Sequence, residues 1–215
     1  WRDWHRVKWD LGVKSKVAIV GFCQTSRDMV PYSDPDMEIW GLNRGTIFMP
    51  RADRWFEMHG KNIFTHAQRR PGRHTAWLNA FAGPVYMHQI FEDVQNSVAF
   101  PLREIAEDIG ANHWRTDGKG KEWDTRGEPY LSSSIAYEIG LAIWEGFKEI
   151  HLYGVDLNTE SEYAWQKPGV EYLLGLAVGR GIKVVLPNNC PLAKGNLYGR
   201  GFMSEEPEHM SYEQL

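Results

Sequence analysis

The hydrophobic positions of this chain fall into short continuous runs that alternate with amphipathic stretches. Runs rich in β-branched and aromatic residues are typical of buried strands. Six such runs predict strands at residues 16–22, 37–43, 53–59, 84–88, 148–157 and 182–187. Because strands that alternate with helices form parallel sheets, the pattern predicts an α/β fold with a mostly parallel sheet flanked by helices.

Three stretches have the apolar spacing of helices, at residues 101–110, 132–147 and 167–181. In the first, Pro101 is expected at the first helical position, and Gly110 is expected to form a left-handed cap. The third has Pro168 near its predicted start. From residue 132 to 187 the order helix, strand, helix, strand predicts two crossover units, which are right-handed in almost all known sheets.

Composition limits the number of domains. The 215 residues, 42% of them hydrophobic, suffice for one substantial core. We expect a single domain over residues 1–202 and an acidic tail over residues 203–215. Residues 113–129 are polar and rich in glycine, a composition suited to a lid over a binding site.

Charge and cysteine content exclude several classes of protein. The formal net charge of −4 gives no general positive field for binding nucleic acids, so any such contact must be local, as at Arg69, Arg70 and Arg73. The two cysteines are too few for a disulfide framework and lack the paired spacing of zinc sites. No apolar run reaches the roughly 18 residues of a membrane span, and the opening residues lack a signal-peptide core, so we expect a cytoplasmic protein.

Polar residues follow the ends of several predicted strands, where parallel sheets bind their ligands. Asp156 and Asn158 come after Gly154 at the end of the fifth strand. Asn43 ends the second strand, where its carboxamide can bind a ribose or a base edge or simply form a turn. We expect Asp156 and Asn158 at the mouth of a site.

Two segments have the composition of anion-binding turns. The loop after the first strand contains Gly21, Gln24, Thr25 and Ser26, and it fits either a phosphate cradle or a plain strand-to-helix turn. Ser132, Ser133 and Ser134 precede the long helix, where one serine explains capping and three suggest an anion or nucleotide contact. The loop matches neither a Walker motif nor a G-x-G-x-x-G motif.

Candidate acids, bases and substrate-binding groups lie near the same strand ends. His59 ends the third strand in "WFEMH", two residues after Glu57 on the same side of the strand. It is either a general base or an ordinary surface histidine. The segment between the fifth strand and the third predicted helix adds Tyr163 and Glu171, which are either substrate contacts or solvated side chains.

These motifs together resemble a known family. "YLSSSIAYEIGLAIWEGFKEIHLYGVDLN" is similar to the segment of bacterial CMP-sialic-acid sialyltransferases that runs from a Thr/Ser-Ser-Gly turn to "GYKEIYLxGIDFY". "VAIVGFCQTS", "WGLN", "EYAW" and "LPNNCPLA" resemble that family's "AGNGPS", "RCN", "YAF" and "CPNSLLA", in the same order over roughly residues 16 to 195. A related set of Rossmann-like proteins includes 6-hydroxymethylpterin diphosphokinases, and the pattern from "YGVD" to the last predicted strand also resembles that of phage proteins.

The resemblance implies a Rossmann-like fold and a nucleotide-sugar donor of the CMP or UDP type. It implies that Asn43 and the turn of Ser132 to Ser134 contact the nucleotide, and that Gly21 to Ser26 surround its phosphate. Tyr163 would lie beside the phosphate or leaving group, and Asp156 would shape the same pocket.

The chain also departs from the family pattern. Asn158 replaces a tyrosine, Ser134 replaces a glycine, and no histidine stands in the shortened segment "QKPGVEY", which corresponds to the place of the family's catalytic histidine. A different base, Glu171, His59 or Asp156, would be needed to activate an acceptor hydroxyl.

Three functions are therefore open. The first is a nucleotide-sugar-dependent glycosyltransferase that acts on a glycan or, if the protein is phage-encoded and works in the host cytoplasm, on a modified DNA base held through the three arginines. The second is a diphosphokinase-like phosphotransferase, with Mg²⁺ bound by carboxylates such as Asp156, Glu162 and Glu171. The third is a non-catalytic nucleotide-binding protein.

Overall fold

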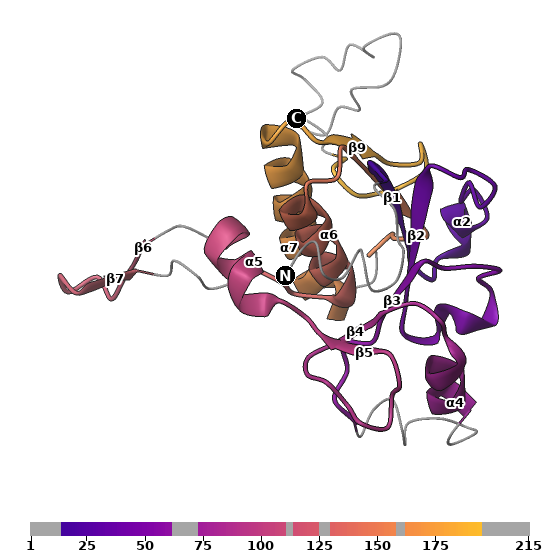
Figure 1. The fold of residues 1–215 in the computed structure, drawn as a ribbon. Coiled ribbons are helices and arrows are strands. Elements are labelled where there is room, and N and C mark those ends of the chain that lie inside the picture. Colours follow the sequence, from indigo (N-terminus) through magenta and orange to yellow (C-terminus); the bar gives the residue numbers. More distant parts are fainter. Residues whose placement is uncertain (1–13, 62–72, 111–113, 125–129, 158–161, 195–215) are drawn as a thin grey trace, which may run out of the picture.

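The structure is a computed structural model, shown in Figure 1, which describes residues 14–61, 73–110, 114–124, 130–157 and 162–194. The N-terminal 13 residues, the predicted acidic tail, Asn158, Arg69 and Arg70 lie outside the described residues. No helix in the described part of the chain is both long and apolar enough to cross a membrane.

A seven-stranded parallel sheet forms the centre of the molecule, in the order β5-β4-β3-β2-β1-β8-β9. Its strands are β1 (Lys16–Val20), β2 (Met37–Leu42), β3 (Arg54–Phe56), β4 (Val85–Met87), β5 (Ser97–Ala99), β8 (Glu149–Tyr153) and β9 (Lys183–Val185). The predicted α/β, Rossmann-like fold is confirmed. The strand of this sheet that the sequence did not predict is β5, because Val98 is the only large apolar residue in it.

Helices cover both faces of the sheet (Figure 1). One face carries α5 (Leu102–Ile109), α6 (Ser134–Glu145) and α7 (Glu162–Gly179), and the other carries α2 (Gln24–Arg27), the 3₁₀ helix η1 (Asn43–Ile47) and α4 (Arg73–Ala80). The main apolar core lies between the sheet and α5, α6 and α7. Inside the predicted lid, β6 (Trp114–Thr116) and β7 (Glu122–Asp124) form an antiparallel hairpin.

Several predicted helix boundaries were wrong. Helix α7 begins at Glu162 rather than near Lys167, so Pro168 lies inside it and Tyr163 lies on its first turn, not in a loop. The proline was interpreted as a start signal because it lacks the N–H that an interior helical residue donates. Pro101 is the N-cap of α5, and Gly110 has φ −59°, so it forms no left-handed cap.

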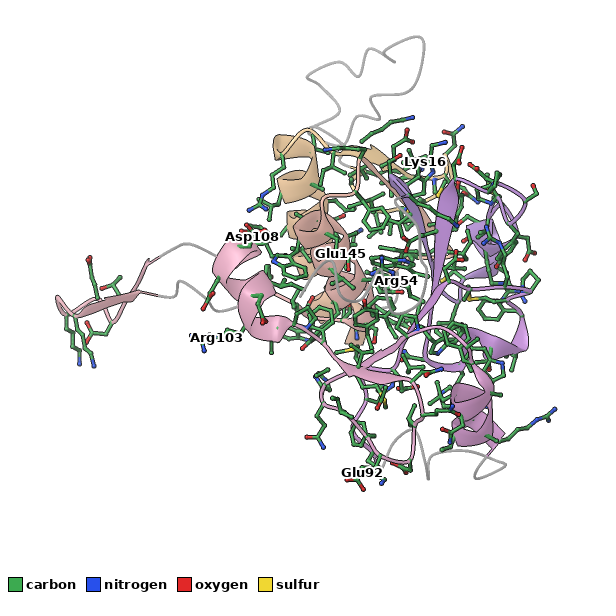
Figure 2. All side chains as sticks on the ribbon, viewed as in Figure 1. Lys16, Arg54, Glu92, Arg103, Asp108 and Glu145 are labelled. Atoms are coloured by element: carbon green, nitrogen blue, oxygen red, sulfur yellow. The ribbon has the colours of Figure 1, made fainter. Side chains whose placement is uncertain are left out.

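Buried charges join the sheet to α6. Arg54 on β3 donates to Glu38 on β2 (Nε to Oε2, 2.8 Å) and to Glu145 on α6 (Nη1 to Oε1, 2.7 Å). Arg54 and Glu38 are completely buried, and only 2% of the Glu145 side chain is exposed. Figure 2 shows Arg54 and Glu145 facing each other between the sheet and the helix. The double pairing compensates the charge that Arg54 carries into the core.

Helix α6 carries another buried acid, Glu138, which has no hydrogen-bonded cation of this kind within the described residues. Neither of its carboxyl oxygens has a hydrogen-bond partner within the residues that the structure describes. Burial raises the pKa of Glu138 well above its usual value, because the ionised form loses its hydration. The core therefore favours Glu138 as a neutral acid.

Replacing Glu138 is expected to change how stability depends on pH. Below the unfolded-state pKa, about 4.5, Glu138 is protonated in both states; above it, only the unfolded chain ionises. The unfolding equilibrium constant then rises about tenfold per pH unit until the folded-state pKa is reached. Glu138→Met removes this effect, so in urea denaturation its advantage over the wild type should widen as the pH rises.

Glu138→Gln is the matched control, because it cannot titrate but keeps a buried polar group. It should show the same change in pH dependence with a smaller gain in stability. A difference between Glu138→Met and the wild type that stays constant with pH would contradict a buried neutral acid.

Candidate functional site

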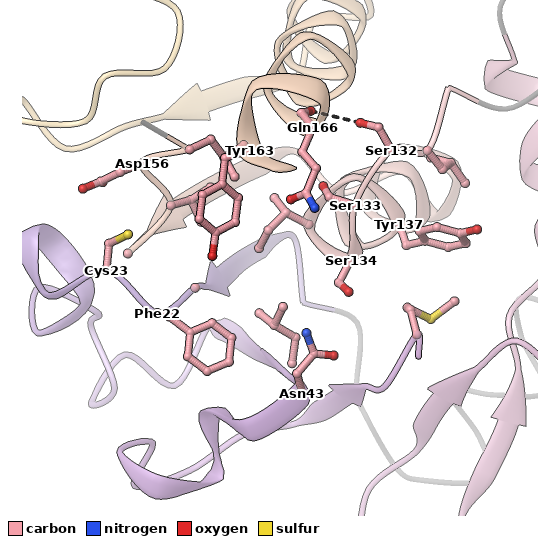
Figure 3. A pocket seen from close by; sticks show the side chains of 18 of the residues that line it. Phe22, Cys23, Asn43, Ser132, Ser133, Ser134, Tyr137, Asp156, Tyr163 and Gln166 are labelled. Atoms are coloured by element: carbon pink, nitrogen blue, oxygen red, sulfur yellow. Dashed lines mark hydrogen bonds between the residues drawn. The ribbon is translucent and has the colours of Figure 1, made fainter. Parts of the chain in front are cut away.

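The chain order of the strands reverses around β1. From β1 the chain builds β2 to β5 on one side, and it later places β8 and β9 on the other. Such a reversal leaves a crevice at the carboxyl ends of the strands. A pocket of about 520 Å³ lies at this position (Figure 3).

The pocket is lined by segments that follow five strands and by two helices. They are residues 21–23 after β1, 42 and 43 at the end of β2, 58 and 59 after β3, His88 after β4, 154–157 after β8, 131–135 and Tyr137 around the start of α6, and Tyr163 and Gln166 on α7. Helix starts and strand ends thus face each other across one cavity.

Two glycines bring the ends of β1 and β8 together. A Cβ atom on Gly21 would clash with the carbonyl oxygen of Gly154, and Gly154 itself has φ +66°, a left-handed conformation that favours glycine. The backbones are hydrogen-bonded here, with Gly21 N donating to Tyr153 O at 2.8 Å and Cys23 N donating to Gly154 O at 2.9 Å. Larger residues would separate the two loops.

Helix α2, which follows the loop after β1, supports the site from outside the lining. Thr25 Oγ1 donates to both carboxylate oxygens of Asp156, at 2.8 and 3.0 Å, and the Ser26 hydroxyl accepts the N–H of Gly154 at 2.8 Å. Gln24, Thr25 and Ser26 do not line the pocket, unlike Gly21 and Asp156. The predicted phosphate loop therefore orients Asp156 and the turn after β8.

The three serines before α6 have different contacts. Ser133 is the N-cap and accepts the N–H of Ala136 at 3.2 Å, while Ser132 donates to the carbonyl oxygen of Gln166 at 2.9 Å and joins α7 to α6 (Figure 3). The Ser134 hydroxyl faces the pocket and makes no hydrogen bond within the described residues. The unpaired N–H groups at the start of α6 give this wall a positive partial charge.

Asn43 approaches Ser134 from the opposite wall (Figure 3). Its backbone is left-handed, with φ +47°, and Trp55 Nε1 donates to its carbonyl oxygen at 3.2 Å. The buried Oδ1 atom of its side chain has no hydrogen-bond partner in the part of the chain that the structure describes. A buried acceptor without a partner is costly, and Asn43 also lines the pocket, so its carboxamide is a candidate ligand contact.

A buried carboxylate joins two histidines at the β3 side of the pocket. Glu57 lies 2.7 Å from Nδ1 of His59 through Oε1 and 2.7 Å from Nε2 of His74 through Oε2. Burial alone would raise the pKa of Glu57, but the hydrogen bonds with His59 and His74 lower it below its usual value. His59 lines the pocket with 42% of its side chain exposed, whereas His74, on α4, is buried.

The remaining predicted site residues have separate positions. Tyr163 lines the pocket, but Glu171 does not, and its Oε1 atom accepts the N–H of Ala193 at 3.0 Å. Asn158 lies outside the described residues. None of residues 114–124 lines the pocket, so the lid stays a prediction. Arg73 is exposed at the start of α4.

Several residues that line the pocket were not predicted from the sequence. His88 ends β4 in "VYMH" as His59 follows β3 in "FEMH", so a search for histidines at strand ends would have found it. Tyr137, on α6, packs edge-on against His88 with ring centroids 5.6 Å apart. Phe22 and Cys23 were covered only by the resemblance of the segment Gly21 to Ser26 to the family's nucleotide loop, with no role of their own. Burial raises the pKa of the Cys23 thiol, which disfavours a reactive thiolate.

The described residues contain no group of three or more His, Cys, Asp or Glu side chains that could hold a metal ion.

Comparison with known proteins gives the fold a precedent. No protein-family model and no curated protein matches this sequence. The sialyltransferase CstII from Campylobacter jejuni, in complex with the substrate analogue CMP-3FNeuAc, matches with a TM-score of 0.51 and 15% identity over 82% of each chain. This chain shares the fold of CstII. A structure of CST-II with a trisaccharide acceptor and CMP matches with a TM-score of 0.50 and 16% identity, covering 82% of this chain and 81% of that one.

The expected sialyltransferase-like fold is therefore confirmed. The likenesses to diphosphokinases and to phage proteins stay predictions.

Gly21→Ala is expected to destabilise the protein by about 1–3 kcal/mol, because the new methyl group meets a backbone carbonyl that cannot move without separating β1 from β8. Urea denaturation measures the loss. Gly175→Ala on α7 is the control: its Cβ would meet nothing within 4 Å, so alanine should be neutral or stabilising. Equal stability of Gly21→Ala and the wild type would show that the contact is not a constraint.

Proposed function

We propose that this protein is a glycosyltransferase that uses a nucleotide sugar, of the CMP type in the first instance. The observation that carries the proposal is the pair of opposed groups in the pocket: the start of α6 with the Ser134 hydroxyl, and the Asn43 carboxamide with its unpartnered oxygen. CstII, which has the same fold, binds CMP and CMP-3FNeuAc, and this supports the donor class.

The phosphate of the donor would bind at the start of α6. The N–H groups there and the Ser134 hydroxyl favour an anion, and α6 is long enough, at 12 residues, to contribute its dipole. Tyr163, 43% exposed on the first turn of α7, points its hydroxyl into the same space (Figure 3). These donors would stabilise the charge that develops on the departing nucleotide phosphate.

His59 is the base that the pocket favours among the three candidates. Glu171 bonds elsewhere, and both oxygens of Asp156 accept from Thr25. In the reaction the acceptor oxygen forms a bond to the anomeric carbon of the donor sugar, and the bond from that carbon to the phosphate oxygen breaks. The acceptor proton passes to His59, and the nucleotide leaves with the bonding electrons.

The acceptor would be an alcohol, since the base must remove a hydroxyl proton. CST-II was crystallised with a trisaccharide acceptor, which favours a glycan. A hydroxymethylated base in DNA, held by Arg69, Arg70 and Arg73, stays a prediction.

Removing either opposed polar group is expected to weaken donor binding. Asn43→Ala and Ser134→Ala should each raise the Kd for CMP about 5- to 30-fold, the worth of one or two hydrogen bonds. Isothermal titration of CMP, UMP, GMP and ATP measures this and ranks the bases. Asn188→Ala, at an exposed asparagine outside the pocket, is the control. Wild-type affinity in Asn43→Ala would refute the nucleotide assignment.

Removing the base should spare binding and reduce turnover. His59→Gln is expected to keep the Kd for CMP and to lower kcat by about 10²- to 10⁴-fold, the usual contribution of general base catalysis. Product formation from a nucleotide sugar and a panel of glycans is the measurement. Full turnover by His59→Gln would rule out His59 as the general base. Selective CMP binding without turnover in the wild type would instead favour the non-catalytic alternative.

A further inference from the structure

The pocket wall beside His59 has a second layer of polar groups. Glu57, with 2% of its side chain exposed, uses one oxygen for His59 and the other for His74. Oε1 also lies 3.4 Å from the backbone N–H of His59, which it accepts. The two histidines come from different elements, the end of β3 and helix α4, so the carboxylate joins them across the fold.

The hydrogen bonds assign the protons of this group. An ionised carboxylate only accepts, so Nδ1 of His59 and Nε2 of His74 both carry hydrogen. Nδ1 of His74 is buried without a partner among the described residues. An N–H there would be a buried donor with no acceptor among these residues, which favours the His74 tautomer that carries its single proton on Nε2.

We propose that Glu57 and His74 are positioning residues that make His59 the base of the reaction, an inference that rests on the proposed function. Glu57 fixes the tautomer of His59 with the proton on Nδ1, which makes Nε2 the nitrogen that takes the acceptor proton. When His59 becomes an imidazolium, its charge lies 2.7 Å from a buried carboxylate. His74 holds that carboxylate in place with a neutral donor, so it adds no positive charge to oppose the imidazolium.

The Glu57, His59 and His74 group would supply a histidine base, which the segment "QKPGVEY" lacks. A histidine base needs a group that orients it. Glu57 would orient His59 as a buried carboxylate orients the catalytic histidine of hydrolases. The other titratable side chains that line the pocket are Cys23, His88, Tyr137, Asp156 and Tyr163. Of these only Asp156 is a carboxylate, and Thr25 bonds both of its oxygens.

The first test needs no substrate. Long-range ¹H–¹⁵N spectra of histidine-labelled protein report tautomer and protonation, and the eight histidines are assigned with His59→Gln and His74→Gln. In the wild type, neutral His59 should carry its proton on Nδ1. In Glu57→Gln its pKa should fall by about one unit or more, because a nearby negative charge favours the imidazolium. A His59 proton on Nε2, or an unchanged pKa in Glu57→Gln, would overturn the proposal.

The role of His74 is tested with two variants. His74→Gln can still place an N–H on Glu57, so His59 should keep its wild-type tautomer and pKa. His74→Leu leaves one carboxylate oxygen without a donor, so the pKa of His59 should move away from the wild-type value. Identical His59 titrations in His74→Leu and the wild type would remove His74 from the proposal, and circular dichroism confirms that each variant is folded.

The second test uses turnover. The acidic limb of kcat/KM against pH reports the base in the free enzyme. In Glu57→Gln it should shift to lower pH with about a 10- to 100-fold lower kcat and an unchanged Kd for CMP, whereas Asn188→Ala, outside the pocket, should follow the wild type. An unmoved limb in Glu57→Gln would overturn the positioning role. If no donor and acceptor react, the proposed function fails, and the NMR titrations still decide whether Glu57 and His74 control His59.

Discussion

The close approach of two backbones at Gly21 and Gly154 is the contact on which the site depends. It occurs between β1 and β8, where the strand order reverses, and it closes one side of the crevice with main-chain atoms. Because no side chain separates the two loops, Thr25 reaches Asp156 and Ser26 reaches the N–H of Gly154. At this side of the pocket the polar groups are therefore hydrogen-bonded to one another within the protein. The polar groups on the other sides remain for a ligand.

The polar side chains divide into supporting and ligand-facing groups. Thr25, Ser26, Ser132 and Ser133 have their hydroxyls in bonds that hold loops and helix ends. In contrast, Ser134 and Asn43 line the cavity, and the Ser134 hydroxyl and the buried Oδ1 atom of Asn43 make no such bonds within the described residues. This division distinguishes a built site from a mere cluster of polar residues at strand ends.

The sequence predicted the features that depend on local pattern. Strand ends are visible where apolar runs stop, so Asn43, His59 and Asp156 were correctly placed at one edge of the sheet. The hydrogen-bond partners of side chains depend on the tertiary structure. The spacing of residues in the sequence therefore predicted neither the hydrogen bond from Thr25 to Asp156 nor the one between His74 and Glu57. Pro168 misled the prediction of α7, because a proline tolerated inside a helix has the same local signature as one at its start.

The bond between Arg54 and Glu145 also links the elements that carry the proposed base and the proposed phosphate site. It ties β3, whose end leads to His59, to the final residue of α6, whose first turn carries Ser134. His59 follows β3, and the helix start that would hold the phosphate belongs to α6. The Arg54 guanidinium joins these two elements at the ends that lie away from the pocket. Helix α7, which brings Tyr163 and Gln166 to the pocket, packs on α6 in the same core and is joined to its start by the hydrogen bond from Ser132 to the carbonyl oxygen of Gln166.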